Sequence, residues 1–448
     1  MRALVVALLA CACTRSDPPG PGTRAPERPA SASAMAPNPP KVATPEPSLP
    51  AQPAAPEDAR VVYPFERVHS PIGSVVLRSL REIAAREPKL RADAFLKVGD
   101  SITFSDDSLH CFGRREPELG AHGDLAETLA RFRGEGRRQP FTRQSHAAKI
   151  GWSAWQALSG NPSPVDRELR DTRARFALVQ YGTNDLEIGS AHYFADSLWN
   201  IVDHLTAKGV IPVLFTIPGR GDRKDRDVWV PRYNALVRGI AQSAQVPLVD
   251  YHLALSSLSG RGLGRDGIHP TTYLGPRGRD GCALSEEGLR HGYNTRNRLV
   301  LEALSRLGRA LETGQPLDDD EPTRSGAGTF SEPLSIDALP YADVLAHDAA
   351  EPRDDRYACA GARPAPGPER VYRFRLREAT TVRIQGYDRG GQVDLHLLSN
   401  PSPEACVRSA ERVITSRLPP GTYFVVADEV SREKKLVPPR SLVVIQAE

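Results

Sequence analysis

A serine, an aspartate and a histidine in this chain stand where they could together carry out nucleophilic catalysis. Ser101 follows the apolar run 94–98 after a Gly-Asp pair, so it lies where a buried strand ends and a turn begins. Asp266 and His269 lie three residues apart in a glycine-rich loop. A serine hydroxyl is a weak nucleophile until a neighbouring base removes its proton. Histidine suits that role because its unperturbed pKa is about 6.5, and an aspartate on its other ring nitrogen would fix the tautomer.

A further segment, residues 181–185, could stabilise the charge that such a reaction creates. It follows the strand-like run 176–180 and contains Asn184, whose side-chain amide is a hydrogen-bond donor. Donors aimed at a developing oxyanion lower the barrier to acyl transfer. Each segment by itself is typical of an ordinary turn. Three of them in this order, two at the ends of strand-like runs, favour a catalytic interpretation.

The three segments resemble, in sequence and in order, the motifs of the SGNH (GDSL-type) hydrolases, over roughly residues 90–310. The resemblance implies that Ser101 is the nucleophile and that His269 is the general base. It also implies that Asp266 is the carboxylate that orients the histidine. The first motif has isoleucine where the family name implies leucine, an apolar exchange that leaves the reacting atoms unchanged.

The same resemblance implies an oxyanion hole with three donors. These are the backbone amide of Ser101, the glycine Gly151 of a second motif, and the side chain of Asn184. No cofactor and no metal site are expected. The neighbouring Asp250 and His252 are interpreted as a turn at the end of a strand rather than as a metal-binding pair.

The expected reaction is hydrolysis of an acyl ester through an acyl-enzyme on Ser101, with acetyl esters of a polysaccharide as the expected substrate. Three alternatives remain open. The same residues serve lipid ester hydrolases of the lysophospholipase or thioesterase type. An acyl-enzyme can also pass its acyl group to a sugar hydroxyl, which would make the protein an acyltransferase. The alternative from another class is an inactive lipoprotein that binds a surface.

The segments around these residues alternate between strand and helix patterns. The runs 210–216 and 246–250 are apolar enough for buried strands, and apolar residues recur at helical spacing within 194–205 and 233–244. Such alternation predicts an α/β fold with a parallel sheet covered by helices on both faces. We expect a hydrolase domain over residues 61–313, and the resemblance implies a flavodoxin-like three-layer α/β/α architecture. Arginine and glutamate residues on its helices are interpreted as solvated faces.

A linker is predicted at 314–340, and beyond it the pattern changes to strands. Apolar and charged side chains alternate through 372–376, and similar runs follow between turn signals. This pattern predicts an all-β sandwich over residues 341–448. The stretch 365–430 also resembles the bacterial pre-peptidase C-terminal (PPC-like) domains, which implies an accessory module without catalytic residues.

The first residues resemble an export signal. A basic residue precedes the apolar run 3–10, which is too short to span a bilayer. The tetrapeptide that ends at Cys11 resembles a bacterial lipobox, which implies a lipoprotein signal peptide over 1–13 and lipidation of Cys11, with Cys13 as the alternative. Residues 14–60 are rich in proline and alanine and predict a disordered tether. We therefore expect an exported protein, lipid-anchored to the cell envelope at its periplasmic or cell-surface face.

Four cysteines lie in the predicted folded domains, and four cysteines allow three pairings. Domain membership favours Cys111 with Cys282 and Cys359 with Cys406. Disulfides fit an oxidising compartment. The net charge is only +3, and no basic stripe is interleaved with aromatic residues, so nucleic acid is not an expected partner. The expected partners are an acylated carbohydrate or lipid substrate, and the membrane through the anchor.

Overall fold

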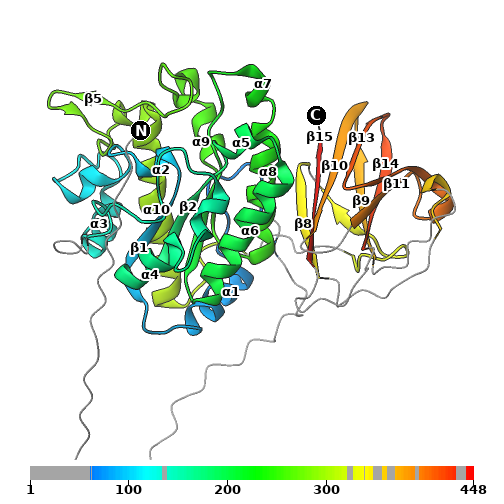
Figure 1. The fold of residues 1–448 in the computed structure, drawn as a ribbon, viewed down its shortest axis with the longest axis horizontal. Helices are drawn as coiled ribbons and strands as arrows, with labels where there is room; N and C mark the ends of the chain where they lie inside the picture. Colours follow the sequence, from blue (N-terminus) through cyan, green and yellow to red (C-terminus); the bar gives the residue numbers. More distant parts are fainter. Residues whose placement is uncertain are drawn as a thin grey trace, which may run out of the picture. The chain divides into compact units, whose positions relative to one another are not determined.

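The computed structural model describes most of the chain from residue 61 onward (Figure 1). The described residues are 61, 63–133, 139–319, 326–337, 339–346, 356–360, 369–388, 393–429 and 440–447. The predicted signal peptide 1–13, with Cys11 and Cys13, and the predicted tether 14–60 lie outside the described residues. Among the residues described, no helix is both long enough and apolar enough to cross a membrane.

A four-stranded parallel sheet forms the centre of the first folded domain. Its strands follow one another in the order β1 (Arg91–Gly99), β2 (Ala174–Gln180), β3 (Ile211–Phe215) and β4 (Leu248–Val249). All seven residues of β2 are buried, as expected for a central strand covered on both faces. The predicted parallel α/β sheet is therefore confirmed.

Helices cover this sheet on both faces (Figure 1). The longer helices are α1 (Ser74–Ala85), α3 (Ala126–Phe132), α4 (Pro164–Thr172), α6 (Ala191–Ala207), α8 (Val230–Ala244) and α10 (Gly292–Thr313). Shorter helical turns are α2 (Ser101–Phe104), α5 (Asp185–Ile188), α7 (Lys224–Asp227), α9 (Tyr251–Ser256), η1 (His110–Gly113), η2 (Gly123–Leu125), η4 (Ala154–Leu158), η5 (Ser259–Gly262) and η6 (Gly288–Arg290). Helices α6 and α8 both pack against β3, and each turns an apolar stripe toward the core.

The carboxyl end of β1 leads into α2 through a close approach that only glycine permits. A Cβ atom on Gly99 would lie 2.3 Å from the Thr103 hydroxyl oxygen and 2.7 Å from the Gln180 carbonyl oxygen. The chain can therefore turn tightly and begin α2 at Ser101. Because the strands are parallel, the segments that follow β1, β2 and β3 all leave the sheet at the same edge, where α/β folds carry their sites.

The second folded domain is an all-β sandwich, as predicted. One sheet has the order β13-β10-β15-β8 and the other β12-β11-β14-β9-β7. Apolar side chains from both sheets form one core. The strands are β7 (Leu334–Ile336), β8 (Tyr341–Ala346), β9 (Glu369–Leu376), β10 (Thr380–Asp388), β11 (Val393–Leu398), β12 (Cys406–Glu411), β13 (Val413–Leu418), β14 (Gly421–Glu429) and β15 (Arg440–Ala447), with short helical turns η8 (Ala358–Ala360) and η9 (Pro403–Ala405).

The predicted linker 314–340 is partly incorporated into both domains. Strand β7 pairs in parallel with β9 and buries Leu334 and Ile336. At the other end, the Asp318 carboxylate accepts hydrogen bonds from the backbone of Ile72 (2.7 Å) and from Arg306 (2.6 Å). The contact between Ile72 and Asp318 spans 246 positions, and β7 pairs with the distant strand β9, so local composition indicates neither of them. The prediction of a linker was therefore too broad at both ends.

Candidate active site

Three side chains form a continuous hydrogen-bonded chain at the sheet edge. Ser101 begins α2, and its Oγ lies 2.8 Å from Nε2 of His269. The other ring nitrogen, Nδ1, lies 2.6 Å from the Asp266 carboxylate. The serine is thus joined to its partners across 168 positions of sequence. This is the arrangement in which an imidazole can take a proton from a hydroxyl while a carboxylate fixes its tautomer.

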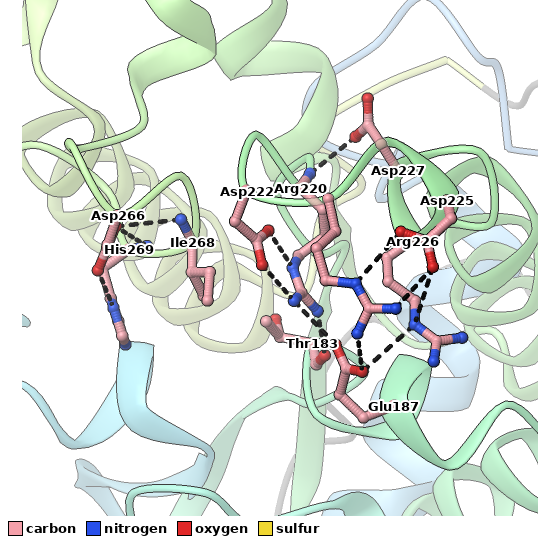
Figure 2. Close-up of polar contacts among 11 residues, drawn as sticks. Thr183, Glu187, Arg220, Asp222, Asp225, Arg226, Asp227, Asp266, Ile268 and His269 are labelled. Carbon is pink, nitrogen blue, oxygen red and sulfur yellow. Dashed lines mark hydrogen bonds and ion pairs between the residues drawn. The ribbon is translucent and has the colours of Figure 1, made fainter.

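The Asp266 carboxylate is held by its own loop as well as by the histidine. Its Oδ1 accepts hydrogen bonds from the backbone amides of Ile268 (3.1 Å) and His269 (3.0 Å), as Figure 2 shows. Partial burial acts to raise the pKa of Asp266, but the His269 ring and the two amides outweigh it and lower the pKa below its usual value. The carboxylate is therefore ionised at neutral pH and can stabilise an imidazolium.

The site is open to solvent. The side chains of His269 and Asp266 are 41% and 50% exposed, respectively. The loop that carries them is nevertheless fixed, because the amide of Gly264 donates to the His269 carbonyl (2.7 Å) and Leu263 forms a bridge with Pro270. An acyl group on a large molecule can reach such a site without entering a deep cleft.

Two of the three predicted oxyanion donors, Gly151 and Asn184, lie on segments that contact each other. The side-chain amide of Asn184 donates to the carbonyl of Trp152 (2.9 Å), the residue after Gly151. The chain just before Gly151 is bound to the end of β1, where the amide of Lys149 donates to the Gly99 carbonyl (3.2 Å). Gly151 itself has a φ of +76° and is exposed. The fold therefore brings these segments to the Ser101 end of β1, and their catalytic role stays a prediction.

Residues 98–273 match the model of the GDSL-like Lipase/Acylhydrolase family. The chain contains a GDSL-like lipase/acylhydrolase domain. Members of this family hydrolyse esters, and the protein is an enzyme of this class. The match spans all of the segments that carry Ser101, Asn184 and His269.

The chain also matches solved structures, among which are a lipase, an esterase and a hydrolase. A GDSL-like lipase from Bacteroides thetaiotaomicron is 16% identical, with 52% of this chain and 97% of that chain covered and a TM-score of 0.32. An acetylxylan esterase from Geobacillus stearothermophilus is 15% identical, with 47% and 93% covered and a TM-score of 0.30. An α/β hydrolase from the metagenome of Lake Arreo, Spain, is 19% identical, with 48% and 95% covered and a TM-score of 0.32. No curated protein matches the chain.

A buried arginine of the GDSL-like domain contacts α2, the helical turn that begins at Ser101. Arg296 of α10 donates to the side chains of Gln180 (2.7 Å), Ser108 (2.8 Å) and Thr103 (3.2 Å). It therefore joins the end of β2 to α2 and to the loop that follows α2. Arg296 was not predicted from the sequence. Its burial depends on which strand ends meet α10, and local periodicity contains no signal for that.

The carboxylates of Asp100 and Asp185, next to the site residues, are also buried, and the sequence did not predict this. Burial raises the pKa of Asp100 to about 6, against the opposing effects of a hydrogen bond from the Ile102 amide and the charge of Arg296. Burial likewise raises the pKa of Asp185 to about 7, against the hydrogen bond that its carboxylate accepts from Ala154. Both residues directly adjoin a predicted catalytic residue, which is the only sequence signal that could have indicated them.

The Asp100→Asn variant is expected to change how stability depends on pH. A carboxyl whose pKa is raised in the folded state stabilises the fold below its unfolded pKa of about 4, and that contribution is lost as pH rises through about 6. Asparagine keeps the oxygen that accepts from Ile102 and cannot ionise. At pH 7.5 the free energy of unfolding of the variant should exceed that of the wild type by about 3 kcal/mol. Near pH 4 the two free energies should be almost equal. Urea unfolding of both proteins at the two pH values measures this, and equal pH dependence would contradict it.

The two predicted disulfides are both present. Cys111 and Cys282 are joined with their Cα atoms 5.8 Å apart, and Cys359 and Cys406 with theirs 5.3 Å apart. The first disulfide connects the segment after α2 to the segment after the His269 loop.

Asp250, which the sequence analysis considered with His252, caps α9 by accepting a hydrogen bond from the amide of Leu253 (3.0 Å). The segment follows the end of β4, as expected, but it begins helix α9, which includes His252, and the interpretation as a turn was therefore wrong.

Proposed function

We propose that the GDSL-like domain is a serine esterase whose catalytic triad is Ser101, His269 and Asp266. The observation that carries this proposal is the unbroken hydrogen-bonded chain from the serine hydroxyl through the imidazole to an ionised carboxylate. Ser101 Oγ attacks the carbonyl carbon of the ester while His269 Nε2 takes its proton. The imidazolium returns the proton to the departing alcohol, which leaves an acyl-enzyme. Water, activated by the same imidazole, then releases the acid.

The oxyanion of each tetrahedral intermediate is bound by the backbone amides of Ser101 and Gly151 and by the side chain of Asn184. Support comes from the contact between the last two segments and from their attachment to the end of β1. Preorganised donors of this kind act without reorganisation at the moment of reaction.

The Asn184→Ala variant is expected to lower kcat by about 10²- to 10³-fold, because one side-chain donor to the oxyanion is lost. KM should change little, since the donor acts mainly in the transition state. Steady-state kinetics with p-nitrophenyl acetate measures both values. Gln144→Ala is the matched control, because Gln144 is an exposed amide on a loop of the same domain. A kcat within about twofold of the wild type would remove Asn184 from the proposed oxyanion hole.

The proposed substrate is a short acyl ester, such as acetyl, on a polysaccharide outside the cytoplasm. The half-exposed His269 and Asp266 suit an ester carried by a large molecule. The two disulfides suit an oxidising compartment. Export with lipidation at Cys11, or at Cys13, would place the enzyme at the cell envelope, and the β-sandwich would serve as its PPC-like accessory module.

A fluorophosphonate probe and an ester series test the proposed function. The wild type should be labelled at Ser101, should release acetate from acetylated xylan or acetylated peptidoglycan, and should favour p-nitrophenyl acetate over longer esters. Ser101→Ala should lose labelling and hydrolysis. Activity that rises beyond eight carbons would indicate a lipid ester hydrolase, and acyl transfer to an added sugar would indicate an acyltransferase. Absence of labelling in the folded protein would overturn the proposal in favour of a surface-binding protein.

A further inference from the structure

Arg220, in the loop after β3, is nearly buried and makes polar contacts through all three of its guanidinium nitrogens. Its side chain is 5% exposed. Nε and Nη2 donate to the two carboxylate oxygens of Asp222, each at 2.8 Å. Nη2 also donates to Glu187 (2.8 Å), and Nη1 donates to the carbonyl of Thr183 (3.2 Å). Figure 2 shows Arg220 surrounded by these three partners.

Two of these partners flank the predicted oxyanion donor, Asn184, in the sequence. Thr183 immediately precedes Asn184, and Glu187 lies on α5, which begins immediately after Asn184. Arg220 therefore binds the chain on both sides of that donor. A shift of the guanidinium would move the backbone that sets where the Asn184 amide points.

The loop of Arg220 also binds the loop of the general base. The amide of Gly221 donates to the carbonyl of Gly267 (2.7 Å), which lies between Asp266 and His269 in sequence. Gly267 has a φ of +68°, and a Cβ atom there would lie 2.3 Å from the backbone nitrogen of Asp222. The two loops thus touch backbone to backbone.

A second connection runs from Arg220 through Asp227 to the segment before the base loop. The backbone amide of Arg220 donates to the Asp227 carboxylate (2.7 Å), and that carboxylate accepts from Arg261 at 2.9 Å. Arg261 lies on η5, whose last residue accepts from the amide of Thr271 (2.8 Å), just after the base loop. The base loop is therefore held on both of its sides.

We propose that Arg220 is a positioning residue that fixes the Asn184 donor and the His269 loop together, relative to Ser101. The inference rests on the proposed function, because it concerns the alignment of that reaction's oxyanion donor and base. Arg220 has no role in proton transfer. It acts because a planar guanidinium can bind a carboxylate with two parallel hydrogen bonds and still donate to a carbonyl, which the single ammonium of lysine cannot reproduce.

Steady-state kinetics of Arg220→Ala and Arg220→Lys tests the proposal. Misplacement of catalytic groups by about 1 Å can cost about 10²-fold. We expect kcat of Arg220→Ala to fall by about 30- to 100-fold while KM stays within about threefold. Arg220→Lys should recover little of the loss. Millimolar guanidinium chloride should restore part of kcat in the alanine variant with saturation, whereas sodium chloride at equal ionic strength should not.

The matched control is Arg223→Ala. Arg223 lies in the same cluster and pairs with Asp225 and with Glu187, but its side chain is 46% exposed, and within the described part of the chain no hydrogen bond or ion pair joins that side chain to Thr183 or to the base loop. Exposed ion pairs contribute little to the stability of the local structure. The kcat of this variant should therefore stay within about twofold of that of the wild type.

Hydrogen exchange supplies a readout that does not depend on turnover. In Arg220→Ala, amide exchange should accelerate in both 183–188 and 264–271, and not across the sheet. Full kcat in both Arg220 variants, or exchange that is unchanged or faster everywhere, would overturn the proposal. A wild type without esterase activity would instead refute the proposed function. The exchange pattern alone would then decide whether Arg220 holds the segments 183–188 and 264–271 in place.

Discussion

Replacement of His269 by alanine is expected to lower kcat for ester hydrolysis by about 10⁴-fold or more, with residual catalysis from the oxyanion hole and substrate binding. The ring stands 2.8 Å from the serine hydroxyl and 2.6 Å from Asp266, so its loss leaves Ser101 without a base and the leaving alcohol without an acid. Fluorophosphonate labelling should slow in parallel, because the probe reacts with the same activated hydroxyl. Stopped-flow and steady-state assays with p-nitrophenyl acetate measure the effect.

His122→Gln is the control for this variant. His122 lies just before η2 and is not part of the hydrogen-bonded chain of Ser101, His269 and Asp266, so its replacement should leave kcat within about twofold. The alanine variant should also unfold at nearly the same urea concentration as the wild type, because the His269 side chain is half-exposed and its loss leaves no cavity in the core. A kcat reduction of less than tenfold would contradict the role of His269 as general base.

Removal of the Cys111–Cys282 disulfide is expected to lower the free energy of unfolding of the GDSL-like domain by about 4 kcal/mol. The crosslink joins residues 171 positions apart, so its loss releases a long loop in the unfolded chain, and the loop-closure term grows with loop length. The double variant Cys111→Ser/Cys282→Ser should therefore lose esterase activity at a clearly lower urea concentration than the wild type. Activity is the readout because it reports on this domain alone.

The second disulfide provides the comparison. Cys359 and Cys406 are 47 positions apart and lie in the β-sandwich. The variant Cys359→Ser/Cys406→Ser should leave the urea midpoint of esterase activity nearly unchanged. Equal midpoints for all three proteins would show that the Cys111–Cys282 bond does not stabilise the active domain.

The candidate site could be predicted largely because its residues sit in short local motifs at the ends of strands. Ser101 follows a buried strand, and Asp266 reaches His269 within one loop. Backbone geometry then brings the ends of parallel strands to one edge. The GDSL-like family match covers the same motifs. The proposed lipid anchor at Cys11 lies outside the described residues and stays a prediction.

The sequence by itself determined the α/β class, the position of the β-sandwich and the pairing of the cysteines. These features depend on local periodicity, on turn residues and on domain membership, all of which are readable along the chain. Only the tertiary structure decided which charged side chains became internal. Arg296 reaches Gln180 across 116 positions, and Arg220 reaches Thr183 across 37. The free energy of a buried charge depends on partners contributed by other elements, and helical or strand spacing does not encode those partners.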